Sequence, residues 1–173
     1  GRNGYKSSLF EGGIGVPFIA RWPGKIAADV VDDVSLISAV DLLPTFCEVA
    51  NVKLPEDYLP DGVSQVSTLK GTVAAERNKP LFWKMQSPWP AREKQPFHWV
   101  SYAVVEGHWK LVCNKDGSHC ELFDLQADPF EKQDVSAKEL AVVKKMKLLL
   151  ADWKLTLPAK PSGNVFSVER KGL

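Results

Sequence analysis

The segment that most constrains the fold is a short polar turn, Asp116-Gly117, set between Cys113 and Cys120. An Asp-Gly pair flanked by apolar stretches is typical of a tight β-hairpin turn. Pairing outward from this turn places Cys113 opposite Cys120. Opposed residues of an antiparallel pair have Cα atoms about 4.5–5.5 Å apart, within the range of a disulfide. The two cysteines are therefore expected either to form a disulfide, in an exported protein, or to stay as thiols in a reducing compartment.

Further strand-like segments surround this hairpin. The predicted strands cover residues 81–85, 98–106, 108–114 and 120–125, with Gly107 in a tight turn. Downstream, Ser136 and Glu139 have the spacing of a capping box, and apolar residues then recur every three or four positions. The apolar face of this predicted helix consists of Leu140, Val143, Met146, Leu149, Leu150 and Trp153. We expect an α+β subdomain over residues 76–173, an antiparallel sheet with a helix laid across it.

The first part of the chain has a different pattern. Residues 16–22, VPFIARW, are almost continuously apolar and end at a Pro-Gly pair, which predicts a strand buried on both faces. Ser38 and Asp41 are spaced as a capping pair before a helix, in which Pro44 fits only within the first turn. Residues 1–75 are expected to be a segment of an α/β domain, poorly covered or rearranged where its neighbouring strands are missing.

The composition argues against several classes of protein. Among 173 residues, 22 are Lys or Arg and 21 are Asp or Glu, so no basic excess points to nucleic acid. No apolar run approaches the roughly 20 residues of a membrane helix. The sequence lacks C-x-x-C, H-E-x-x-H, Walker, G-x-G-x-x-G and G-x-S-x-G motifs, so we predict no metal ligands, nucleotide site or esterase serine. Asp32-Asp33 is interpreted as a solvated pair and Cys47 as a core residue.

The candidate site lies at the start of the chain, where Lys6 and two serines precede Glu11-Gly12-Gly13. A lysine ammonium is a point charge suited to an anionic oxygen. Consecutive glycines indicate either a positive φ or the close approach of another chain segment. Loops at strand ends are where α/β folds place their sites. The residues alone leave open an ordinary surface lysine before a glycine turn.

Six ordered blocks spanning residues 6 to 136 together carry a family resemblance. The first block is K-x-S-x-x-E-G-G-I-x-V-P-F-I-x-R-W-P-G. The others are ISAVDLLPTFCEVA, LPDGVS, LFWKM, YAVVEGHWKLV and ELFDLQADPFEKQDVS. Each block alone is a weak signal, but six in the same order are a strong one. Together they resemble the sulfatase family, in particular the C-terminal portion of arylsulfatases and N-acetylgalactosamine-6-sulfatases.

This resemblance implies an α/β domain of the alkaline-phosphatase type, followed by a subdomain with a four-stranded antiparallel sheet and a C-terminal helix. It implies hydrolysis of a sulfate ester, with a formylglycine nucleophile and a calcium ion. In that family the lysine of the first block contacts the substrate sulfate, which assigns this role to Lys6. Glu11, Gly12 and Gly13 would shape the turn. His98, after a proline-rich loop, is a candidate for the substrate cleft.

The chain also departs from the family pattern. No C-x-P-S/A-x-R occurs, so no catalytic nucleophile is assigned to this chain, and no metal ligand is assigned either. Gly15 stands where many members have arginine, a change that could loosen packing or alter a salt bridge. We expect the chain to be the C-terminal portion of a sulfatase, inactive alone, with calcium and formylglycine supplied by residues outside it.

Two other interpretations remain open at this point. One is a related hydrolase of the same superfold that acts on phosphate esters or phosphonates. The other is a non-catalytic carbohydrate-binding or interaction module. The expected partners are a sulfated small molecule or glycan and the missing N-terminal sulfatase portion, with a homo-oligomer left open and no nucleic acid or membrane. By family likeness, the protein is expected to be exported to the periplasm, the extracellular space or the lysosome.

Overall fold

The computed structural model describes residues 1–72, 77–85 and 96–158. Its centre is a four-stranded antiparallel sheet in the order β1-β2-β3-β4. The strands are β1 (Leu81–Lys84), β2 (Tyr102–Glu106), β3 (Trp109–Cys113) and β4 (Cys120–Asp124). All four predicted strands are therefore confirmed, although β2 begins at Tyr102 rather than at residue 98. Most of the proline-rich loop, residues 86–95, and the chain after residue 158 lie outside the described residues.

The hairpin between β3 and β4 has the predicted register. Cys113 lies opposite Cys120, and the two sulfurs form a disulfide. Gly117 supplies the positive φ of the turn, and Asp116 accepts a hydrogen bond from the Ser118 N–H. Local turn chemistry thus sets the pairing of the two strands, because a hairpin loop fixes the register on both sides.

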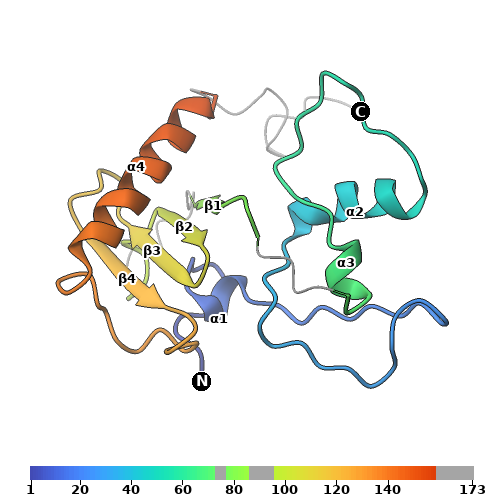
Figure 1. The fold of residues 1–173 in the computed structure, drawn as a ribbon. Coiled ribbons are helices and arrows are strands. Elements are labelled where there is room, and N and C mark those ends of the chain that lie inside the picture. The colour runs from blue at the N-terminus through green and yellow to red at the C-terminus, as the bar shows by residue number, and fades with distance from the viewer. Residues whose placement is uncertain (73–76, 86–95, 159–173) are drawn as a thin grey trace, which may run out of the picture.

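The long helix α4 (Leu140–Thr156) lies across one face of the sheet, as Figure 1 shows. Met146 and Leu150 are buried against this face. The predicted capping box is wrong, because the helix begins at Leu140 and the Ser136 N–H and hydroxyl bind the Asp134 carboxylate instead. The sheet residues of this layer are Val104, Leu111, Cys113 and Leu122.

The opposite face of the sheet is covered by the N-terminal segment. Leu9 and Phe10 are buried there, just before the short helix α1 (Glu11–Ile14). The Phe10 ring contacts Phe97, Trp99 and Phe123 at centroid separations of 5.1, 6.3 and 5.9 Å. The start of the chain and the sheet therefore share one core, across the division at residues 75 and 76 that the sequence suggested.

The predicted strand over residues 16–22 is wrong. This segment has no regular secondary structure, and its side chains are poorly covered, with Val16 78% and Ile19 91% exposed. A strand forms only where a neighbour accepts and donates its backbone hydrogen bonds. Among the described residues, the four strands bind one another and none lies alongside this segment.

The predicted N-terminal helix is confirmed as a short 3₁₀ turn, η1 (Ala39–Asp41), followed by α2 (Leu42–Val49). The Ser38 N–H donates to Asp41 Oδ2 at 2.8 Å, as the capping pair required. Pro44 lies in the first turn of α2, where no helical bond is lost. One further short helix, α3 (Val66–Leu69), contacts α2.

The disulfide gives a direct test of the hairpin. Replacing both Cys113 and Cys120 by alanine should lower the free energy of unfolding by about 2 kcal/mol, because the crosslink closes a short loop in the unfolded chain. Urea unfolding of the chain measures this loss. Dithiothreitol should cause a similar loss in the original chain and none in the double variant. An original chain that is indifferent to dithiothreitol contradicts the crosslink.

Candidate functional site

Lys6 lies at the tip of a tight turn formed by Tyr5, Lys6, Ser7 and Ser8. The Ser8 N–H donates to the Tyr5 carbonyl at 2.9 Å, and the Tyr5 N–H donates to Ser8 Oγ at 3.2 Å. Ser7 has a φ of +74°, the left-handed conformation that the third position of a type II turn requires and that glycine usually supplies. Such strain costs about 1–3 kcal/mol and persists only where the surroundings impose it. Ser8 is buried, whereas Lys6 is exposed.

The two glycines after the turn allow the chain to fold back on itself. A Cβ atom on Gly12 would lie 2.3 Å from the Gly4 carbonyl oxygen, and one on Gly13 would lie 2.3 Å from the Ser8 carbonyl oxygen. Neither glycine has a positive φ. The Gly12 N–H donates to the Asn3 carbonyl at 2.7 Å. Of the two explanations for this pair, close approach of another chain segment is therefore the one observed.

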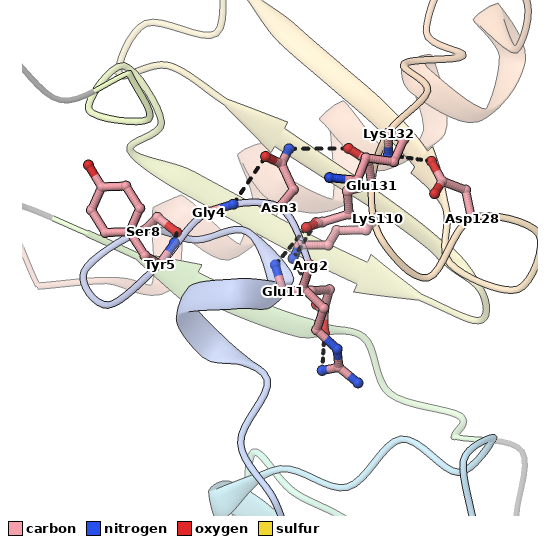
Figure 2. A network of polar contacts seen from close by, with 10 residues as sticks. All are labelled: Arg2, Asn3, Gly4, Tyr5, Ser8, Glu11, Lys110, Asp128, Glu131 and Lys132. Atoms are coloured by element: carbon pink, nitrogen blue, oxygen red, sulfur yellow. Dashed lines mark hydrogen bonds and ion pairs between the residues drawn. The ribbon is translucent and has the colours of Figure 1, made fainter.

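A buried lysine lies between two glutamates behind this turn (Figure 2). Lys110 Nζ lies 2.8 Å from Glu11 Oε1 and 2.8 Å from Glu131 Oε1, and its side chain is fully buried. The contact with Glu11 is a hydrogen bond. The contact with Glu131 is an ion pair without the geometry of a hydrogen bond. The Glu11 N–H also donates to Glu131 Oε2 at 2.6 Å. Three charged groups from distant parts of the sequence thus meet in one cluster.

Sequence reasoning missed this cluster. Neither Lys110 nor Glu131 is among the site residues predicted from the sequence. A signal was present for Lys110, because it lies two positions before the buried Val112 on β3. Residues two apart in a strand point to the same face. No such signal marks Glu131, whose backbone has a left-handed φ of +54°. Its contact with Glu11 joins residues 120 positions apart.

Gly15 makes room for an arginine from elsewhere in the chain. A Cβ atom at this position would lie 2.3 Å from Arg2 Nη1. That guanidinium nitrogen lies 3.7 Å from Glu11 Oε2, so Arg2 adds a second cation beside Glu11 (Figure 2). Since the Arg2 side chain is half exposed, this pair is weaker than the buried one.

His98 is exposed and has no hydrogen bond or ion pair to Lys6 in the described part of the chain. Its neighbour Phe97 does reach the turn, since the Phe97 ring lies 5.6 Å from the Tyr5 ring in an edge-to-face arrangement. The segment that carries His98 is therefore side by side with the turn that carries Lys6. The placement of His98 in a substrate cleft remains a prediction.

A second buried ion pair, between Arg77 and Asp41, lies at the start of α2. Arg77 Nη1 lies 2.7 Å from both carboxylate oxygens of Asp41, and both side chains are buried. The Val63 N–H donates to Asp41 Oδ1 at 2.9 Å, which binds the loop after Gly62 to the start of α2. This pair is structural, because neither residue contacts the Lys6 turn in the described part of the chain.

Residues 1–72, 77–85 and 96–158 contain no group of three histidine, cysteine, aspartate or glutamate side chains that could hold a metal ion. The described residues therefore do not fit a calcium site. Cys47 is a free, half-buried thiol on α2. Within the same described ranges, no helix is long and apolar enough to cross a membrane.

The pH dependence of stability tests the buried position of Glu131. Burial raises the pKa of Glu131, and the nearby Lys110 ammonium offsets this only in part. The folded protein then holds this proton more tightly than the unfolded chain does. The free energy of unfolding should consequently fall as the pH rises from about 4.5, the ordinary pKa of a glutamate, through the raised value.

Glu131→Gln removes this titration, so the unfolding free energy of the variant minus that of the original chain should increase over the same pH range. Denaturant unfolding at a series of pH values measures the difference. Glu139→Gln, at an exposed glutamate, serves as the matched control. A difference that does not change with pH contradicts the burial of Glu131.

The sequence of this chain is similar to those of known sulfatases. The model of the N-sulphoglucosamine sulphohydrolase C-terminal family matches residues 4–155. The N-acetylgalactosamine-6-O-sulfatase of Bacteroides thetaiotaomicron is 28% identical over 85% of this chain and 29% of its own length. Arylsulfatase A of Bos taurus is 31% identical over 91% of this chain and 34% of its length. The chain spans about a quarter to a third of the curated relatives it matches.

Solved structures agree. One from work on glycosaminoglycan metabolism by Bacteroides thetaiotaomicron has a TM-score of 0.68 and 27% identity, and covers 89% of this chain and 32% of that one. Ps i-CgsB shares the fold, with a TM-score of 0.70 at 23% identity over 88% of this chain and 31% of its own. The fold is thus the C-terminal part of the alkaline-phosphatase-like sulfatase fold, and the chain belongs to the sulfatase family of sulfate ester hydrolases.

Proposed function

We propose that this chain is the C-terminal portion of a sulfatase and that Lys6 binds the sulfate group of its substrate. The observation that carries the proposal is an exposed ammonium held at the tip of a strained, internally bonded turn. A group in this position can meet a ligand without rearrangement of the backbone. Hydrolysis of a sulfate ester breaks a sulfur–oxygen bond, and water supplies the oxygen of the released sulfate.

Lys6 would act on the charge that develops in this reaction. As the bond to the leaving oxygen breaks, negative charge grows on that oxygen, while the other sulfate oxygens already carry charge. A fixed ammonium beside them stabilises the transition state, because it needs no reorganisation when the charge appears. The substrate is a sulfate ester of an aromatic or carbohydrate alcohol.

The rest of the chemistry would come from outside these 173 residues. Formylglycine would supply a covalent nucleophile and calcium would supply positive charge in the active enzyme, while the described residues of this chain form no site for the metal. The isolated chain should therefore be inactive. What the chain itself would contribute is the placement of the Lys6 ammonium, on a turn whose Tyr5 ring packs against Phe97.

The preceding portion of the enzyme is the proposed partner of residues 16–22. This segment exposes apolar side chains beside an apolar hollow of about 350 Å³. An apolar surface of this kind is typical of an interface rather than of free surface. The relatives are about three times as long as this chain, which leaves ample sequence to cover it. The hollow is lined in part by Phe18, Ile19, Trp22, Ile37, Leu42 and Phe46.

Export is the proposed location. The disulfide between Cys113 and Cys120 supports it, because such bonds persist mainly in oxidising compartments.

Turnover of 4-nitrophenyl sulfate by the complete enzyme tests the proposal. Lys6→Met should lower kcat by about 100- to 1,000-fold, the usual effect of removing one charge-stabilising donor. The matched control Lys138→Met, at another exposed lysine, should leave the rate unchanged.

Three results would count against the proposal. Activity of Lys6→Met equal to that of the control would exclude a role for Lys6. Turnover by the isolated 173 residues would show that the nucleophile lies within this chain. Turnover of a phosphate or phosphonate ester in place of the sulfate ester would indicate the related class of hydrolase.

A further inference from the structure

The two sides of the Lys6 turn are bound to one short segment of chain. Before the turn, the Asn3 N–H donates to the Phe130 carbonyl at 3.1 Å and Asn3 Nδ2 donates to the Glu131 carbonyl at 3.2 Å. After the turn, the Glu11 N–H donates to Glu131 Oε2 at 2.6 Å. Glu131 thus holds both ends of the segment whose tip is Lys6 (Figure 2).

Lys110 makes this arrangement electrostatically possible. The carboxylates of Glu11 and Glu131 both contact its ammonium, and without that charge two carboxylates would face each other in a largely buried space. Like charges in such a place repel strongly, because water screens them poorly. Lys110 projects from β3, which is paired with a strand on each side, so the ammonium has a rigid base.

Gly12 and Gly13 connect the position of Glu11 to that of the Lys6 turn. With Glu11 fixed by Lys110, the Gly12 N–H binds the Asn3 carbonyl, and Gly13 lies against the Ser8 and Tyr5 carbonyl oxygens. These contacts leave no space in which the turn could shift without breaking a hydrogen bond. The location of the turn is therefore set by the sheet, through Lys110 and Glu131.

We propose that Lys110 and Glu131 are positioning residues that fix the location of the Lys6 ammonium in the sulfatase site. This inference rests on the proposed role of Lys6, and adds that the C-terminal sheet sets where that charge lies. Neither residue touches the substrate. An error of about 1 Å in the place of a reacting or binding group can cost about 100-fold in rate, so the effect on turnover is large.

A double-mutant cycle in the complete enzyme tests the proposal. With 4-nitrophenyl sulfate as substrate, Lys110→Met should lower kcat/KM by about 10- to 100-fold, as the loss of a supporting residue typically does. In a Lys6→Met background the same substitution should change kcat/KM by less than about threefold, because its effect passes through Lys6. Lys110→Arg should restore part of the activity, since the charge is kept.

Lys145→Met is the matched control, because Lys145 also pairs with a glutamate, Glu106, but is exposed and far from the turn in sequence. It should leave kcat/KM unchanged. If Lys110→Met does not fold, the charge-balanced variant Lys110→Met/Glu131→Gln carries the same cycle. Equal losses with and without Lys6 would overturn the proposal, since they would show that Lys110 acts independently of Lys6.

Amide hydrogen exchange separates this proposal from that of the function. In Lys110→Met and Glu131→Gln, the amides of Glu11 and Gly12 should exchange at least about tenfold faster, while those of β2 and β3 keep their rates. This readout needs no activity. If the complete enzyme hydrolyses no sulfate ester, the role of Lys6 fails, but faster exchange would still show that Glu131 and Lys110 hold the turn. Unchanged exchange at Glu11 and Gly12 would overturn the positioning itself.

Discussion

The buried charge of Lys110 is the interaction on which the arrangement of this chain depends. Lys110 projects from the sheet and joins Glu11 of α1 to Glu131, which lies between the last strand and α4. Removing one partner of such a cluster typically costs about 3–5 kcal/mol, because the remaining charges stay buried and unpaired. Its presence is nevertheless poor evidence of net stabilisation, since burial raises the pKa of Glu131 despite the nearby ammonium. What the cluster adds is a fixed location for Glu11 relative to β3, because the carboxylates of Glu11 and Glu131 both contact the Lys110 ammonium.

The N-terminal segment that carries Glu11 and Lys6 also packs on the sheet. Leu9 and Phe10 complete the core on one face of the sheet, and α4 completes it on the other. A sheet with both faces covered is a rigid base. The turn that carries Lys6 emerges directly from this packed layer, so the exposed Lys6 side chain stands on a backbone with little freedom. The family to which the chain belongs hydrolyses sulfate esters, and a fixed cation is what the charge of a sulfate requires.

Local signals predicted the C-terminal part of this fold well. The Asp116-Gly117 turn predicted the register of β3 and β4, and the apolar period predicted the face on which α4 buries Met146 and Leu150. Leu140 of the predicted face is an exception, because it is 69% exposed. The failures share a physical cause. Residues 16–22 have the composition of a buried strand, yet a strand needs hydrogen bonds from neighbours that no local pattern contains. The contact of Lys110 with Glu11 spans 99 positions of sequence, which is likewise invisible to a local pattern. For Lys6, the family resemblance rather than the residues themselves indicated a role, and the turn geometry was accessible only from the structure.

Exchange of the lysine ammonium protons with water, followed by ¹⁵N NMR of the lysine side chains, tests the central claim most directly. The account predicts that the Lys110 ammonium exchanges slowly, because it is fully buried between two carboxylates, while the exposed Lys6 ammonium exchanges fast. The slow signal should also shift in Glu131→Gln. A Lys110 ammonium that exchanges as fast as that of Lys6 would contradict the account, because the charge that joins the turn to the sheet would then be in water.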